Sequence, residues 1–146
     1  MSLKTDIIFV KALSSNADLM AKLPAHNIYN PGIVIPEDGQ DNVKLPYIIV
    51  SYSGMTNENR TKDSFEGVSD AVQINIEVAA KNREELADIA ETVRATIRDY
   101  FIEADPEDED YYLVPDDYRV SAGPVMLDDA KPCVWQTLNY ACDTNV

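Results

Sequence analysis

The chain has 146 residues, a length that suits one domain able to bury a core without disulfides or metals. Apolar residues make up 45% of the chain, which excludes a disordered protein. The net charge of −14, from 12 basic and 26 acidic residues, argues against direct binding to nucleic acid or to anionic lipid, because both ligands need Lys and Arg to replace their counterions.

The first predicted element is a helix over residues 5–23. Ser14-Ser15-Asn16 predicts a break within it, since these side chains compete for backbone hydrogen bonds, and Asn16 would cap a second short piece ending at Pro24. Ser2 or Thr5 is expected to cap the first piece. The expected apolar stripe consists of Leu3, Ile7, Val10 and Leu13.

Two extended segments follow, over residues 28–35 and 45–53, separated by a turn-forming stretch at 36–42. The segment 54–69 is polar, mixed in charge and too long for a tight hairpin, and such a segment inside a compact domain is often functional or disordered. We therefore take it as a candidate interaction element. Its candidate contact residues are Asn57, Arg60, Lys62 and Phe65.

The clearest pattern lies at residues 70–79, where apolar and polar side chains alternate strictly and predict a strand with one buried face. A helical period begins directly afterwards, with Asn82 as its cap and Glu85 reaching back to Asn82. This strand and helix form the nucleus of the predicted fold. The apolar stripe of the helix is Leu86, Ile89, Ala90, Val93, Ile97 and Phe101.

The segment 103–117 holds eight carboxylates and neither Lys nor Arg, so the rest of the chain carries only −6. Asp105, Glu107 and Glu109 have the alternating spacing of calcium ligands, but Asp110 stands where a calcium loop needs Gly, and a solvated acidic loop is the expectation. Tyr111 and Tyr112 beside it are either partner contacts or anchors folded onto the sheet.

The last predicted strands cover residues 118–127, interrupted by Gly123-Pro124, and residues 133–142. Trp135 shares its face of the final strand with polar residues, so we expect this strand to be covered on both faces. Cys133 and Cys142 would lie roughly 30 Å apart along it, too far for a disulfide, which suits a reducing compartment. No signal or membrane-spanning segment is evident, so we expect an intracellular protein that is not secreted.

Together these elements predict a single α+β domain over residues 1–146, with an acidic insertion at about 103–117. Its order is α-β-β-β-α-β-β, with one mixed or antiparallel sheet of about four or five strands packed by two helices. No catalytic, metal-binding or cofactor-binding motif stands out. The only histidine, His26, has no partner at metal-ligand spacing, and the serines and glycines form neither a nucleophile elbow nor a phosphate loop.

The order and spacing of these pieces over residues 3–101 resemble the bacteriophage tail-completion family of tail terminator and minor tail proteins. The resemblance rests on the first helix, the Ile28-Tyr29-Asn30-Pro31 segment, the strand opening Leu45-Pro46-Tyr47-Ile48-Ile49-Val50, and Gln73-Ile74-Asn75-Ile76-Glu77-Val78 before a long helix. It implies a non-enzymatic protein without cofactors, assembled as a ring, commonly a hexamer. Such a ring joins tail-tube and head-connector proteins, first in the host cytoplasm and then in the virion of a phage or prophage.

Two other classes of function are compatible with the sequence. An acidic inhibitor or DNA mimic would account for the net charge, although a mimic should spread carboxylates over a whole face and here they gather in one segment. A small enzyme would need a pocket of convergent titratable groups, for which the sequence offers no matching set.

Overall fold

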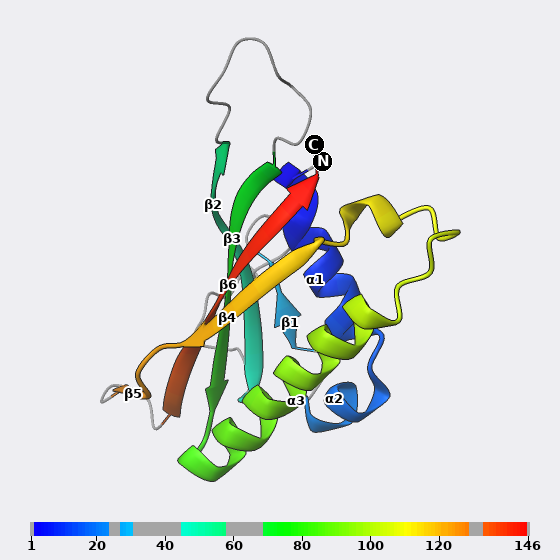
Figure 1. Ribbon diagram of the computed structural model, residues 1–146. Coiled ribbons are helices and arrows are strands. Elements are labelled where there is room, and N and C mark those ends of the chain that lie inside the picture. Colours follow the sequence, from blue (N-terminus) through cyan, green and yellow to red (C-terminus); the bar gives the residue numbers. More distant parts are fainter. Residues whose placement is uncertain (1, 24–26, 31–44, 58–68, 129–132, 146) are drawn as a thin grey trace.

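The computed structural model describes residues 2–23, 27–30, 45–57, 69–128 and 133–145, and it has the predicted α+β architecture (Figure 1). Three helices pack on a mixed sheet of six strands. The helices are α1 (Thr5–Ser14), α2 (Ala17–Lys22) and α3 (Arg83–Ile102); the strands are β1 (Ile28–Tyr29), β2 (Tyr47–Asn57), β3 (Ser69–Ala80), β4 (Asp117–Ala122), β5 (Met126–Asp128) and β6 (Cys133–Asn145); and two short 3-10 turns are η1 (Ser2–Lys4) and η4 (Tyr111–Leu113).

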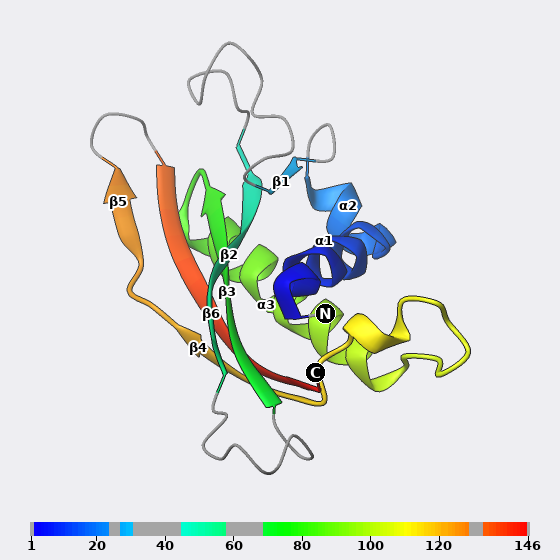
Figure 2. The ribbon, with the colours of Figure 1, turned by 90° about the horizontal axis from the view of Figure 1, so that it is seen from above.

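The strands run in the order β1-β2-β3-β6-β4, with β5 pairing beside β4 on the same edge of β6. Among the strands that the structure describes, β1 and β2 pair in parallel and all other neighbours are antiparallel. All three helices lie on one side of the sheet, which curves around them (Figures 1 and 2). The core therefore lies between the sheet and the helices, and none of the described helices lies on the opposite face of the sheet.

The predicted nucleus of the fold is confirmed. Val72, Ile74, Ile76 and Val78 of β3 are fully buried, and each contributes on the order of 1.5–3 kcal/mol of burial free energy. The Asn82 Oδ1 accepts a hydrogen bond from the Glu85 backbone N–H at 2.9 Å, which starts α3 as expected. The Glu85 side chain reaches one residue further back than predicted, because its carboxylate accepts from the Lys81 N–H at 3.3 Å.

The predicted stripe of α1 is confirmed for Leu13, which is buried, and for Val10, which packs partly buried against the core, but it is wrong for Leu3 and Ile7. Leu3 and Ile7 are 70% and 48% exposed, and the buried side chains are Thr5, Ile8, Phe9, Ala12 and Leu13. Apolar residues occur on several sides of this helix, so periodicity alone does not decide which side is buried. Lys4 precedes the helix without a side-chain cap, where Ser2 or Thr5 was expected to provide one.

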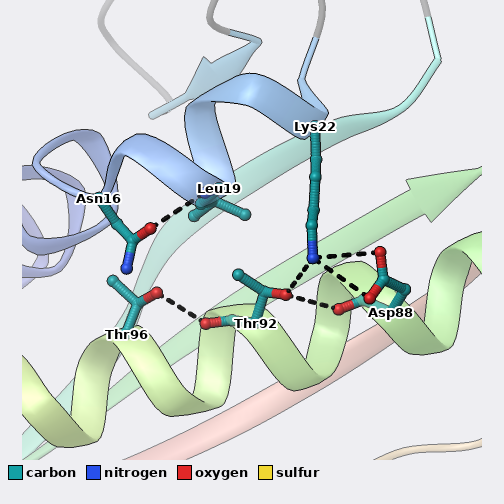
Figure 3. A network of polar contacts seen from close by, with 6 residues as sticks. All are labelled: Asn16, Leu19, Lys22, Asp88, Thr92 and Thr96. Carbon is teal, nitrogen blue, oxygen red and sulfur yellow. Dashed lines mark hydrogen bonds and ion pairs between the residues drawn. The ribbon is translucent and has the colours of Figure 1, made fainter.

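The predicted break at residues 14–16 separates α1 from α2. Ser15 Oγ donates to the Ala12 carbonyl at 2.8 Å, and the Asn16 Oδ1 accepts from the Leu19 N–H at 3.0 Å, which caps α2. Lys22 then holds α2 on α3, since its Nζ donates to Thr92 Oγ1 at 2.9 Å and lies 3.1 Å from an Asp88 oxygen (Figure 3). The break therefore gives two helices, as predicted, and Lys22 links the second of them to α3.

Strand β2 continues past Gly54, where the sequence predicted a loop. Its pairing with β3 shifts register between Tyr52 and Gly54, so that Ser53 is the extra residue of a bulge. Because of the bulge, Met55 pairs with Val72 and Asn57 with Asp70. Both residues of β2 therefore lie on the same side of the sheet as the buried residues of β3. A glycine that looks like a strand end in the sequence therefore marks an irregularity inside the strand.

Strand β6 was expected to be covered on both faces, and this expectation is also wrong. Leu138, Tyr140 and Cys142 are buried on the helix side, but Asn139 on the other side is exposed, and Trp135 and Thr137 are partly exposed. The mixed composition of that face reflects an open face of the sheet. The Gly123-Pro124 interruption does separate β4 from β5 as predicted.

Candidate functional site

The predicted contact residues of the 54–69 segment lie mostly outside the described residues, which include Asn57 but not Arg60, Lys62 or Phe65. Asn57 ends β2, and its Nδ2 donates to Asp70 Oδ1 at 2.5 Å. Its amide is therefore used within the chain to hold a buried carboxylate of β3.

A buried polar region adjoins this end of the sheet. The Asn30 Nδ2 donates to Asp6 Oδ2 at 3.0 Å, which links the residue directly after β1 to α1. The hydroxyl oxygen of Tyr52 is shielded from solvent and has no hydrogen-bond partner in the part of the chain that the structure describes. Burial raises the pKa of Tyr52, with the Asp6 and Asp70 carboxylates adding to the effect.

Tyr111 and Tyr112 belong to the turn η4, whereas Asn57 ends β2, so the candidate contact residues come from different elements. Their side chains are 43% and 55% exposed, whereas the next residue, Leu113, is 7% exposed and joins the core. Leu113 is thus the buried anchor of the turn, and both tyrosines present much of their surface to solvent.

The acidic segment 103–117 has local order of its own. Asp105 Oδ1 accepts from the Glu107 N–H at 2.9 Å, and Asp108 Oδ1 accepts from the Asp110 N–H at 3.0 Å. Asp110 also pairs with Lys11 of α1, and this hydrogen bond is the main cause that raises the pKa of Lys11. The pair of Asp110 with Lys11 ties the segment to α1.

A depression of about 260 Å³ lies between α1, the end of α3 and the acidic segment. Its floor is apolar and its rim is acidic, with Ile8 and Val114 in the first group and Glu103, Asp105, Asp108 and Asp110 in the second. Among the described residues, no group of three or more His, Cys, Asp or Glu side chains is arranged to hold a metal ion. His26, the sole histidine, lies outside those residues.

The two cysteines lie at opposite ends of β6, as predicted, and neither forms a disulfide. Both are buried. Burial raises the pKa of the Cys142 thiol to about 12, so this thiol stays protonated near neutral pH and is a poor nucleophile.

The sequence did not single out a run of exposed apolar residues at β5. Val125, Met126 and Leu127 are 37%, 41% and 69% exposed, and among the described strands β5 pairs with β6 alone. Three consecutive apolar residues directly after Gly123-Pro124 were the available signal. We refer to this run as the β5 edge.

A comparison with protein-family models gives no match for this chain, and neither does a comparison with curated proteins. Of the helices that the structure describes, none has both the length and the apolar character needed to cross a membrane.

Proposed function

We propose that the chain is a non-enzymatic assembly protein of a phage tail that forms a ring between tail-tube and head-connector proteins. The proposal begins from the family resemblance of residues 3–101, whose expected α+β fold the chain has. It adds that the contacts between neighbouring subunits include the β5 edge.

The observation that carries the proposal is the exposure of this edge. An edge strand presents unpaired backbone groups, and proteins that remain monomeric usually protect such strands with charged side chains or prolines. Here three apolar residues are exposed in succession, with Leu127 at 69%. A head-to-tail contact between this edge and a different surface of the next subunit closes a ring when the rotation between neighbours is fixed.

The test is the mass and shape of the purified chain. Light scattering coupled to size exclusion should give a particle whose mass is a whole multiple of 16.3 kDa, and negative-stain images should show a closed ring. Because each copy carries −14, assembly should strengthen as salt screens the repulsion between copies.

A variant pair locates the contact. Leu127→Lys places a charge on the β5 edge and should abolish the ring, whereas Ile102→Lys adds the same charge at the end of α3, where the side chain is 75% exposed. The ring should survive the second change. A particle that stays monomeric under all salt conditions, or a ring that both variants leave intact, contradicts the proposal.

A further inference from the structure

The sheet face opposite the helices is open in the described part of the chain, and it carries an unusual pair of charges. Residues that are directly paired in an antiparallel sheet point to the same face, so their side chains form rows that run across the strands. One row contains Ile49, Glu77 and Thr137, and another contains Gln73, Ala141 and Arg119.

Glu77 is the first member of the pair. Its side chain is partly buried on this face, and no hydrogen bond or ion pair of the described residues involves it. The Tyr47 phenol is near enough that, after burial, the charge of Glu77 also raises the pKa of Tyr47. Its neighbours in the row, Ile49 and Thr137, carry no charge. Desolvation alone raises the pKa of Glu77. A carboxylate removed from water without a cation beside it is costly, so this position favours a ligand that brings a positive charge.

Arg119 is the second member. It is exposed on β4, and among the described residues it forms no ion pair. Asp117 and Asp143 lie on the same face beyond it, directly opposite each other. Between Arg119 and Glu77 lies a depression of about 320 Å³ with neutral donors and acceptors, among them Gln73, Asn75, Ser121 and Asn139.

The positions of the two charges are symmetric about one residue. Glu77 pairs with Thr137 on one side of β6, and Arg119 pairs with Ala141 on the other. Asn139 lies midway between Thr137 and Ala141. With strands about 4.8 Å apart and about 3.3 Å per residue, the two charged residues are roughly 16 Å apart, with Asn139 at the centre.

We propose that two copies of the chain pack open face to open face about a two-fold axis that passes over Asn139. Arg119 of each copy then meets Glu77 of the other, and the two Asn139 amides face each other. The contact is isologous, because each copy supplies both the cation and the anion. The same symmetry crosses the two sets of strands at a steep angle, as in orthogonal sheet packing.

A second copy suits this face better than an unrelated partner does. The whole chain is strongly acidic, so a partner that approached only by general charge attraction would be basic and would leave Arg119 unmatched. A second copy places a carboxylate beside Arg119 and a guanidinium beside Glu77 at once, and it offers an amide-rich centre to an amide-rich centre. This inference does not depend on the ring, although such pairs are compatible with an assembly of dihedral symmetry.

Charge exchange tests the contact. Glu77→Arg and Arg119→Glu should each weaken dimerisation at least about thirtyfold, the lower end of what losing one partner of a buried charge pair costs. The double variant should dimerise again. Mixing the two single variants should also restore a dimer, because one copy would then carry arginine at both positions and would face a copy that carries glutamate at both.

Sedimentation velocity over a range of concentrations measures the masses, and native mass spectrometry identifies the mixed dimer. Glu84→Arg and Arg83→Glu change the net charge by the same amounts in the first turn of α3 and should leave dimerisation unchanged. A wild-type chain that stays monomeric, single variants that dimerise normally, or a mixture that stays monomeric would each overturn the inference. A ring that still forms in the Glu77 and Arg119 variants but is lost in Leu127→Lys would overturn the inferred two-fold contact and would support the proposed function.

Discussion

Four aromatic rings from four elements form a closed cluster whose contribution to stability can be measured. Phe9 of α1 lies edge-to-face with Phe101 of α3 and Tyr140 of β6, with ring centroids 5.3 and 5.2 Å apart. Tyr118 of β4 closes the cluster against Phe101 at 5.5 Å and Tyr140 at 5.6 Å. Since Phe101 and Tyr118 flank the acidic segment, the cluster also joins the two ends of that segment.

Replacing Phe9 by Leu removes two of these ring contacts from a side chain with no exposed surface. Each aromatic pair contributes about 0.5–1.5 kcal/mol beyond the burial of its area, so the two pairs together amount to about 1–3 kcal/mol. The unfolding free energy should therefore fall by at least this amount, since the smaller side chain also leaves unfilled space. Phe101→Leu should remove the contact with Phe9 from the other side.

Urea unfolding of the wild type, Phe9→Leu, Phe101→Leu and the double variant forms a thermodynamic cycle. We expect a coupling energy of about 0.5–1.5 kcal/mol, with an unchanged dependence on urea concentration. Leu127→Ala at the distant β5 edge is the matched control, and it should be additive with Phe9→Leu. A coupling energy no larger than that of the control pair would show that the rings stabilise only through the area they bury.

Three further changes test single groups. Tyr52→Phe should raise the unfolding free energy by about 1–3 kcal/mol in urea, because it removes a buried hydroxyl that has no partner among the described residues; a loss of stability would reveal a partner. Glu77→Gln should stabilise the monomer at pH 7. Burial raises the pKa of Glu77 in the folded state, so the wild type loses stability as pH rises from about 4.5 through that pKa. The stability advantage of the Gln variant should therefore vanish below pH 4.5. An equal advantage in unfolding measurements at pH 4 and at pH 7 contradicts this prediction. Asn82→Ala should lower the unfolding free energy by about 0.5–2 kcal/mol through loss of the α3 cap, whereas Glu84→Ala in the first turn should cost less, as thermal unfolding can compare.

The parts of the fold that could be predicted are those where local chemistry and tertiary packing agree. The alternation around Ile74 and Ile76 places one face of β3 in the core, and the Asn82 cap sets the start of α3 without help from distant residues. Asn16 does the same for α2. In each case a pattern of a few residues has one low-energy solution.

The errors arose where the local pattern allows two solutions. The α1 helix has apolar residues on several sides, and only the packing against α3 and the sheet selects Phe9 over Ile7 for burial. Gly54 is compatible with either a strand end or a bulge, and only the partner strand β3 decides between them. Sequence periodicity reports which arrangements are possible, and long-range contacts choose among them.

The candidate contact surfaces differ in the same way. Tyr111 and Tyr112 were chosen for their residue type, and both are exposed, but their role as partner contacts remains a prediction. The open face could not be chosen from composition, because Glu77, Asn139 and Arg119 come from three strands and share a face only after the register is set. A surface assembled by register is therefore best tested by exchanging charges between strands, since single substitutions by alanine would not distinguish a reciprocal contact from a merely exposed one.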